Sequence, residues 1–210
     1  IYLRTIMRPI KGLELVGEYT YDRKNWQKSY YAKKWEYTTE QLGSNNSVTS
    51  DYLIKSEDHE DYNALNLYGT YNFSIKEDHM FKVMAGFNQE RKQNSWISVQ
   101  THDMIAPSAP SFTSATGKII PQNSYSDYAI RGAFYRINYN YKDRYLFEAN
   151  GRYDGSSKFP KDDRFGFFPS FSVGWNIARE SWMEKALDYV SDLKLRASWG
   201  QIGNQEDLSD

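Results

Sequence analysis

Three histidines, His59, His79 and His102, are the residues of this chain best suited to hold a metal ion or to move a proton. No pair of them has the spacing of a His-Glu-x-x-His motif, and the chain contains no cysteine that would add a ligand. His59 lies in the charge run at 57–61, which is typical of a solvated strand rim. We therefore expect neither a metal site nor a cofactor.

Carboxylates are the second group that would do chemistry. Asp154, Asp162 and Asp163 flank one polar segment, and glycoside hydrolysis needs two carboxyl groups at a defined separation. Spacing along the sequence does not define that separation, and the segment has the composition of a connecting loop. Residues 200–204 hold two glycines without the Lys-Ser/Thr of a phosphate-binding loop. We expect that the chain is not an enzyme.

Aromatic side chains favour binding over catalysis. Aromatic residues make up 17% of the chain, and large rigid rings stack on sugars or hold peptides. Packing within loops, placement at a bilayer interface or contact with a protein partner would use the same residues. The ligand-contact candidates are four aromatic residues in or beside two long connecting segments: Trp35, Trp96, Phe112 and Tyr125.

The elements that must position these residues alternate between apolar and polar side chains with a period of two, which predicts β-strands. Several are joined by short polar turns, as in antiparallel hairpins. The sequence therefore predicts an all-β, antiparallel fold of about eight strands, at 1–7, 13–22, 62–75, 81–90, 132–141, 145–154, 167–177 and 193–199. A capping box that begins at Ser181 predicts one short helix in a connection near 181–191.

The connections alternate in length. Short ones lie at 8–12, 76–79 and 142–144, and long ones lie at about 29–60, 95–127 and 155–165. Outer-membrane β-barrels have short periplasmic turns and long extracellular loops. No apolar run approaches the roughly 18 residues of a membrane helix, so a helical membrane protein is excluded.

Two architectures fit this pattern. In a transmembrane β-barrel the apolar face of each strand meets lipid. In a soluble β-sandwich, for example a carbohydrate-binding module, the apolar faces of two sheets meet each other. Periodicity supports both equally, but Tyr139, Tyr141 and Tyr145 gather beside a short turn, where a barrel has an aromatic girdle. With a net charge of −1, nothing in the sequence suggests the basic stripe that a nucleic-acid partner would require.

The second half of the chain carries a resemblance to a known family. YRINYNYKDRYLFEANGRYDGSSKFPKDDRFGFFPSFSVGWNI, followed by DLKLRASWGQIGNQ, resembles the SusC/RagA family of TonB-dependent outer-membrane transporters. PIKGLELVGEYTY and FKVMAGFNQE occur earlier in the chain, in the order found in that family. The resemblance covers essentially the whole chain, and it is densest at 135–205.

This resemblance implies a large barrel of the bacterial outer membrane, with a plug domain inside and about 22 strands in total. Residues 1–210 would form part of that single barrel domain, and the plug domain and the remaining strands would lie outside this chain. Family members work with a SusD-like surface lipoprotein and with TonB, which acts through the plug region. They import glycan oligomers or peptides, so the resemblance implies outer-membrane lipid and such a substrate as further partners, and no nucleic acid.

In such a barrel, a charge at mid-depth on the lipid side costs about 2–4 kcal/mol, so charged faces turn inward. We therefore expect five polar residues to face the lumen: Arg136, Asn138, Glu148, Asn150 and Arg152. We expect five apolar residues to face lipid: Tyr135, Tyr139, Phe147, Val173 and Leu195.

Overall fold

The computed structural model describes residues 1–38, 45–48, 50–186 and 191–203. Two compact units divide the chain. The first unit comprises 1–21, 62–91 and 128–210, and the second unit comprises 22–61 and 92–127.

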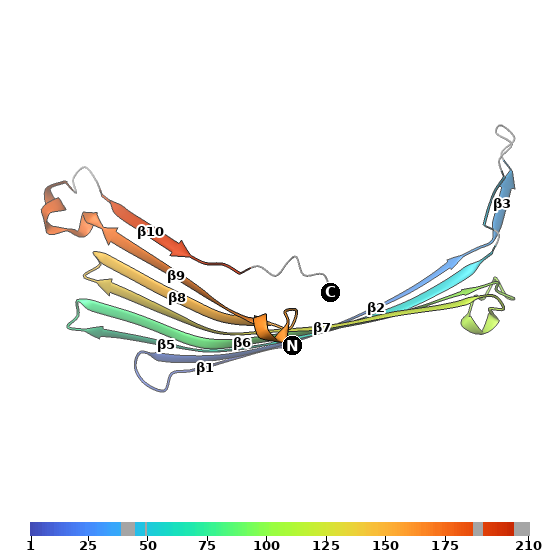
Figure 1. Ribbon diagram of the computed structural model, residues 1–210, viewed down its shortest axis with the longest axis horizontal. Helices are drawn as coiled ribbons and strands as arrows, with labels where there is room; N and C mark the ends of the chain where they lie inside the picture. The colour runs from blue at the N-terminus through green and yellow to red at the C-terminus, as the bar shows by residue number, and fades with distance from the viewer. Residues whose placement is uncertain (39–44, 49, 187–190, 204–210) are drawn as a thin grey trace. The chain divides into compact units, whose positions relative to one another are not determined.

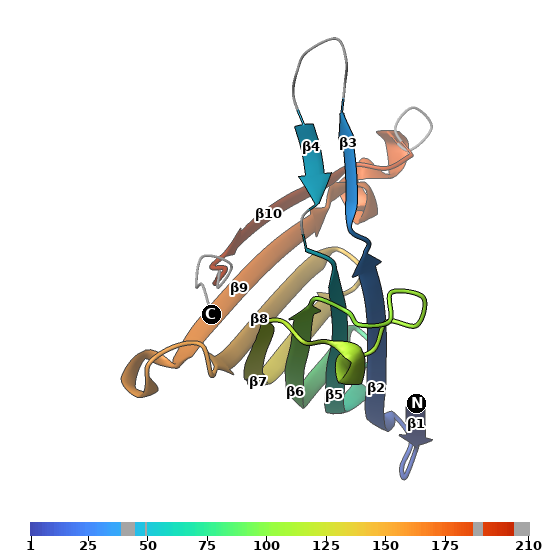
Figure 2. The ribbon, with the colours of Figure 1, turned by 90° about the vertical axis from the view of Figure 1, so that its right-hand side faces the viewer.

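Within the described residues, one sheet has eight strands in the order β1-β2-β5-β6-β7-β8-β9-β10, and a separate sheet has two. The eight-stranded sheet consists of β1 (Tyr2–Met7), β2 (Leu13–Ala32), β5 (Tyr52–Ile75), β6 (His79–His102), β7 (Ile119–Tyr141), β8 (Tyr145–Ser156), β9 (Phe165–Asn176) and β10 (Lys194–Gly200) (Figure 1). The two-stranded sheet is the hairpin of β3 (Trp35–Thr38) and β4 (Asn45–Val48) (Figure 2). The predicted all-β fold of about eight strands is confirmed.

Short turns join consecutive strands at one end of the first unit. Lys142 and Asp143 both have positive φ, 53° and 56°, as two-residue turns matched to the twist of a hairpin require. The Arg144 N–H donates to the Tyr141 carbonyl at 2.9 Å, which closes the turn. Asn140 stabilises it further, because its Oδ1 accepts the Asp143 N–H at 2.9 Å. The polar run at 142–144 therefore sets the register of β7 on β8.

That register separates the side chains of the first unit into two faces. Tyr139 pairs with Phe147, and Phe147 pairs with Val173, so these apolar residues share one face. One position along, Asn138 pairs with Glu148, and Glu148 pairs with Ser172. Because strand side chains alternate with a period of two, this sheet region has one mainly apolar and one mainly polar face.

The second unit differs from the sequence-based expectation. β2 runs to Ala32, β5 begins at Tyr52, β6 runs to His102 and β7 begins at Ile119, so much of the predicted loops at 29–60 and 95–127 is strand. Residues 39–44 and 49 of the first predicted loop lie outside the described residues. The sequence obscured these strands because cross-strand charge pairs replace apolar alternation. Arg23 on β2, for instance, binds Asp61 on β5 at 2.7 Å.

Short 3-10 helices occupy the connections. They are η1 (Phe112–Ser114), η2 (Lys161–Asp163), η3 (Ile177–Arg179) and η4 (Ser181–Ala186). The helix predicted near 181–191 is thus present as η4, in a tighter form than its α-helical spacing suggested, while residues 187–190 lie outside the described residues. None of the helices in the described residues is long and apolar enough to cross a membrane.

Candidate functional site

The polar face of β7–β9 carries a hydrogen-bonded network centred on Asn150. Arg136 Nε donates to Asn150 Oδ1 at 2.7 Å, and Asn150 Nδ2 donates to Glu148 Oε1 at 2.8 Å. Asn150 Nδ2 also donates to Ser170 Oγ at 3.3 Å. Each of these residues comes from an even position of its strand, so the register alone brings them together. The network orients charged groups without burying them.

A second polar pair lies one row away. Arg152 donates to both oxygens of Asp154, at 2.9 and 3.0 Å, in the forked geometry typical of arginine and carboxylate. The Arg152 guanidinium also lies 5.5 Å from the centroid of the Phe134 ring. Gly132 faces Asp154 across the strands, and a Cβ at Gly132 would collide with the carboxylate. Small residues therefore leave space for this pair on the sheet surface.

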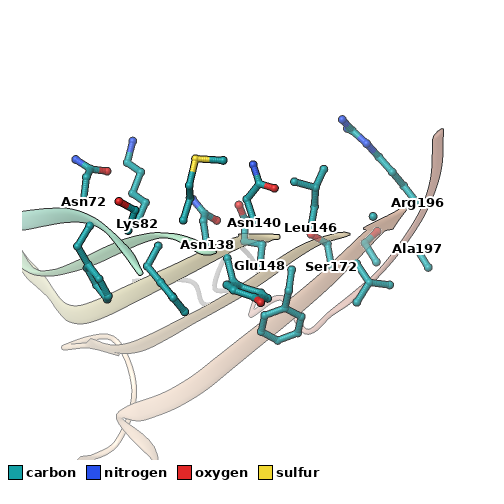
Figure 3. Close-up of a pocket in the computed structure, with 18 residues that line it drawn as sticks. Asn72, Lys82, Asn138, Asn140, Leu146, Glu148, Ser172, Arg196 and Ala197 are labelled. Carbon is teal, nitrogen blue, oxygen red and sulfur yellow. The ribbon is translucent and has the colours of Figure 1, made fainter. Parts of the chain in front are cut away.

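Two hollows of about 790 and 970 Å³ lie along this region of the first unit. Figure 3 shows Asn72, Lys82, Asn140 and Arg196 rising from one side of the sheet around the first hollow. Arg136, Glu148, Asn150 and Arg152 line the second. The register places all five predicted lumen-facing residues on one face, since Asn138 pairs with Glu148 and Phe134 pairs with Arg152.

The opposite face presents large apolar side chains to the surroundings. The five predicted lipid-facing residues lie together on this face: Tyr135, Tyr139, Phe147, Val173 and Leu195. Val173 is 53% exposed and Leu195 is 63% exposed. A water-soluble domain rarely exposes so continuous an apolar surface, which marks it as a contact surface.

An aromatic belt crosses five strands of this apolar face near the short turns. Ring centroids lie 4.8–6.5 Å apart along a series of residues: Phe73, Phe81, Tyr139, His79, Tyr141, Tyr145 and Trp175. Tyr139, Tyr141 and Tyr145 were the part of this belt that sequence alone suggested. The other members come from β5, β6 and β9, so only the strand pairing reveals a continuous row.

Glu180 anchors one end of the belt, and sequence reasoning missed it. Its Oε1 accepts the Tyr145 hydroxyl at 2.7 Å and the Trp175 Nε1–H at 3.0 Å. Arg144 lies 3.4 Å from its Oε2. The Tyr145 hydrogen bond, together with that of Trp175, lowers the pKa of the Glu180 carboxyl. The polar tips of two belt residues are thereby fixed to the connection that follows β9.

The four ligand-contact candidates all belong to the second unit, where each has different neighbours. Trp96 lies within β6 and Tyr125 within β7, so the prediction that they lie in or beside a loop is wrong for both. Tyr125 accepts a hydrogen bond from Gln93 Nε2 at 2.9 Å. Phe112 begins η1, with Lys55 Nζ 5.5 Å from its ring centroid. Trp35 begins β3 and is 47% exposed.

A different group of aromatic rings does come together in the second unit. Tyr30, Tyr52 and His102 lie on three strands, with centroid separations of 6.0 and 5.8 Å. Gln100 Nε2 lies 3.0 Å from His102 Nε2, and Ser50 Oγ lies 3.2 Å from His102 Nδ1. This ring row has polar groups beside it, as a platform for a sugar or peptide requires. Its members are far apart in sequence, so composition alone could not find it.

Asp51 fastens the segment that follows β6. Its carboxylate accepts the Tyr31 hydroxyl at 2.6 Å and the Met104 N–H at 3.2 Å. The hydrogen bond with Asp51 raises the pKa of Tyr31 to about 12, and the same bond lowers the pKa of Asp51. Asp51, Leu53 and Thr101 are all buried. We name this arrangement of Tyr31, Asp51 and Met104 the Asp51 clasp.

The candidates for catalysis and metal binding are dispersed. His59 lies 2.7 Å from Asn25 Oδ1, His79 lies 2.9 Å from the Tyr139 hydroxyl, and His102 belongs to the ring row. Asp154 lies on β8, paired with Arg152, whereas Asp162 and Asp163 lie in η2. Across the described residues, no group of three or more histidines and carboxylates has the arrangement of a metal site.

A two-faced antiparallel sheet of long strands suits an outer-membrane barrel, and sequence comparison decides the family. The sequence profile described as TonB dependent receptor-like, beta-barrel matches residues 7–208. The chain belongs to this family. TonB-dependent receptor barrels are outer-membrane receptors and transporters, so this chain is an outer-membrane protein segment, and the soluble sandwich is excluded.

Similar curated proteins agree with this family. TonB-dependent receptor P26 of Formosa agariphila is 34% identical over 139 residues, which are 64% of this chain and 14% of P26. TonB-dependent receptor SusC of Bacteroides thetaiotaomicron is 50% identical over 72 residues, which are 34% of this chain and 7% of SusC. The resemblance to the SusC/RagA family is confirmed, and the chain spans only a small part of these relatives.

Solved structures show the same fold. The RagAB peptide transporter matches with a TM-score of 0.82 at 20% identity, over 94% of this chain and 21% of that chain. The RagAB peptide importer in its 'closed-closed' state matches with a TM-score of 0.79 at 22% identity, over 97% of this chain and 22% of that chain.

Proposed function

We propose that this chain forms wall and outer strands of a TonB-dependent importer that carries glycan oligomers or peptides across the outer membrane. The observation that supports this most is the register of β7–β9, which places a hydrogen-bonded polar face opposite an exposed apolar face. In a barrel, those faces are the lumen wall and the lipid contact. Residues 1–210 then belong to a single barrel domain, with the plug and the other strands elsewhere in the full protein.

The same proposal includes two protein partners. SusC and the RagAB structures are relatives, and on that basis we infer a SusD-like surface lipoprotein over the outer strands and TonB acting through the plug. The chain itself supplies no chemistry in this scheme. Its contribution is a polar path along Arg136, Asn150 and Arg152, and an outer surface at which substrate is held before entry.

Substrate contact is assigned to the second unit. The ring row of Tyr30, Tyr52 and His102 offers stacking surfaces beside hydrogen-bonding groups. Trp35, Trp96, Phe112 and Tyr125 remain candidates for the same role. Both glycans and peptides would use such surfaces, because sugar rings and peptide side chains stack on aromatic faces.

Cysteine labelling in intact cells tests the assignment of faces, because this chain has no cysteine of its own. Arg136 and Ile137 are exposed neighbours on β7 that point to opposite faces. We expect Arg136→Cys in the full-length protein to react with a water-soluble maleimide, and Ile137→Cys to react only with a membrane-partitioning maleimide. An Ile137→Cys variant that resists both reagents would place this face in a protein core and overturn the proposal.

Growth measurements test transport. A strain without the full-length protein should lose growth on one class of nutrient, either oligosaccharides or peptides, and a plasmid copy should restore it. Alanine at both Tyr30 and Tyr52 should raise the nutrient concentration needed for half-maximal growth, while protein abundance in the outer membrane stays constant. Unchanged growth of the deletion strain on both nutrient classes would contradict the proposed function.

A further inference from the structure

One charged residue interrupts the apolar face. Arg131 on β7 pairs with Gly155 on β8, and Gly155 pairs with Phe165 on β9, so the three share the face of Tyr139 and Val173. Among the described residues of β8, β9, β10 and the first-unit part of β7, this is the one charged side chain on that face. A charge on a lipid-facing surface is tolerated near the bilayer boundary and costly at its centre.

Arg131 forms a compact group with two aromatic rings. Its guanidinium lies 5.2 Å from the centroid of Phe165. Phe165 lies directly over Gly155, since a Cβ at Gly155 would collide with the ring. The ring of Tyr153 also stacks on the ring of Phe165, with centroids 5.2 Å apart and planes inclined by 16°. We call Arg131, Tyr153 and Phe165 the Arg131 cluster.

Among the described residues, the guanidinium in this cluster has N–H donors without an acceptor. Within the described part of the chain, Arg131 is exposed and has no carboxylate within ion-pair distance, and its guanidinium contacts the ring of Phe165. A guanidinium carries five N–H donors in a planar fork, and a ring face satisfies none of them as an acceptor would. By contrast, Arg136 and Arg152 on the polar face both donate to protein side chains.

The Arg131 cluster lies on the apolar face of the first unit, at the end of that face that is farthest from the short turns. Phe165 and Trp175 are ten residues apart on β9, with Trp175 in the aromatic belt. Ten residues of strand span about 33 Å. With a strand tilt of about 40°, that is about 25 Å along the membrane normal, the height of the apolar band of such barrels. If the aromatic belt lies at one membrane–water interface, Arg131 therefore lies at the other.

We propose that the Arg131 cluster binds the phosphorylated headgroup of a glycolipid in the outer leaflet. This inference rests on the barrel part of the proposed function, with the short turns on the periplasmic side as in other outer-membrane barrels. The arginine fork matches phosphate oxygens in a bidentate geometry. The rings of Tyr153 and Phe165 offer faces for a sugar, and the neighbouring apolar surface at Ala133 and Tyr135 accommodates acyl chains.

Native mass spectrometry of the full-length protein tests this, with bisphosphorylated lipid A and fully dephosphorylated lipid A as probes. We expect Arg131→Gln to retain the phosphorylated probe about tenfold less than the unaltered protein, because a charge-assisted, forked contact is lost. Retention of the dephosphorylated probe should not change. Arg131→Lys, which keeps the charge but not the fork, should give an intermediate result.

Arg136→Gln is the matched control, since it removes a guanidinium from the same strand on the opposite face. Equal retention by Arg131→Gln and the unaltered protein would overturn the proposal, as would an equal loss in Arg136→Gln. If Arg131→Gln does not fold, Phe165→Leu keeps the apolar surface and should still lower retention. The lipid measurement does not depend on uptake, so a failed growth test would reject the nutrient role without affecting it.

Discussion

The strands of the two units of this protein carry their side chains differently. In the first unit, most of β7 and β8 alternates, with Tyr135, Ile137 and Tyr139 on one face and Arg136 and Asn138 on the other. In the second unit, β2, β5 and β6 remain paired but carry charges in succession. Arg23 binds Asp61, and its neighbour Lys24 binds Glu60 at 2.9 Å.

Hydrogen bonding between strands is therefore independent of the alternation. Backbone pairing needs only extended chains in register, whereas alternation records that the two faces meet different media. We infer that the first unit contacts two media and that the second unit contacts water on both faces. Ladders such as Lys24–Glu60–Lys92, with contacts of 2.9 and 2.7 Å, also charge the long strands and oppose pairing with other chains.

The largest expected effect comes from placing arginine at matched isoleucines of the two units. Ile137 on β7 and Ile97 on β6 are 36% and 52% exposed. If the apolar face of the first unit contacts lipid, Ile137→Arg near mid-depth should lower the free energy of unfolding in bilayers by about 2–4 kcal/mol. Ile97→Arg, in water, should change it by less than about 0.5 kcal/mol.

Denaturant titration of the full-length protein in lipid vesicles measures both changes. Equal losses at the two positions would show that exposure, and not the surrounding medium, sets the cost. That outcome would remove the distinction between the units.

The intermediate effect concerns the Asp51 clasp. Asp51→Ala leaves the Tyr31 hydroxyl and the buried Met104 N–H without their acceptor, and an unsatisfied buried N–H costs about 1–3 kcal/mol. We expect faster hydrogen exchange in residues 103–118, with no change in β8 or β9. Asp58→Ala, which removes a carboxylate from β5, is the control. Equal exchange in the two variants would mean that Asp51 does not fasten the segment.

This clasp also has a defined pH window. The lowered pKa of Asp51 means that its contribution is complete above the ordinary value of 3.8 and is lost as pH falls through the lowered value. The raised pKa of Tyr31 means that the donor is retained below 10.0 and is lost as pH rises through about 12. Exchange in 103–118, corrected for its intrinsic pH dependence, should therefore be flat from about pH 5 to 9.

The difference between the units also explains which strands alternation in the sequence could locate. Alternation located β8 and β9 to within a few residues and placed Arg136 and Phe147 on opposite faces, because burial in two media constrains every position. It failed for the outer parts of β5 and β6, where Glu60 and Lys92 support pairing through charge. A periodicity test has no signal where both faces are solvated.

Sites made by several strands were equally hard to foresee. The ring row joins Tyr30, Tyr52 and His102, and the belt is anchored by Glu180, which follows β9 in a connection. Register between distant strands decides such contacts, and composition does not contain it. For the same reason the sequence predicts a loop at Trp96 and Tyr125, although both lie in strands.

The smallest expected effect is at Glu60, whose contacts with Lys92 and Lys24 lower the pKa of its carboxyl. Exposed ion pairs stabilise proteins weakly and are screened by salt, so Glu60→Gln should lower the thermal midpoint only slightly at low ionic strength. In about 1 M salt the difference should vanish, because the Debye length there is about 3 Å. It should also vanish as pH falls through the lowered pKa. A large, salt-independent loss in Glu60→Gln would mean that the second unit is dry on this face, and that charge there is buried and not solvated.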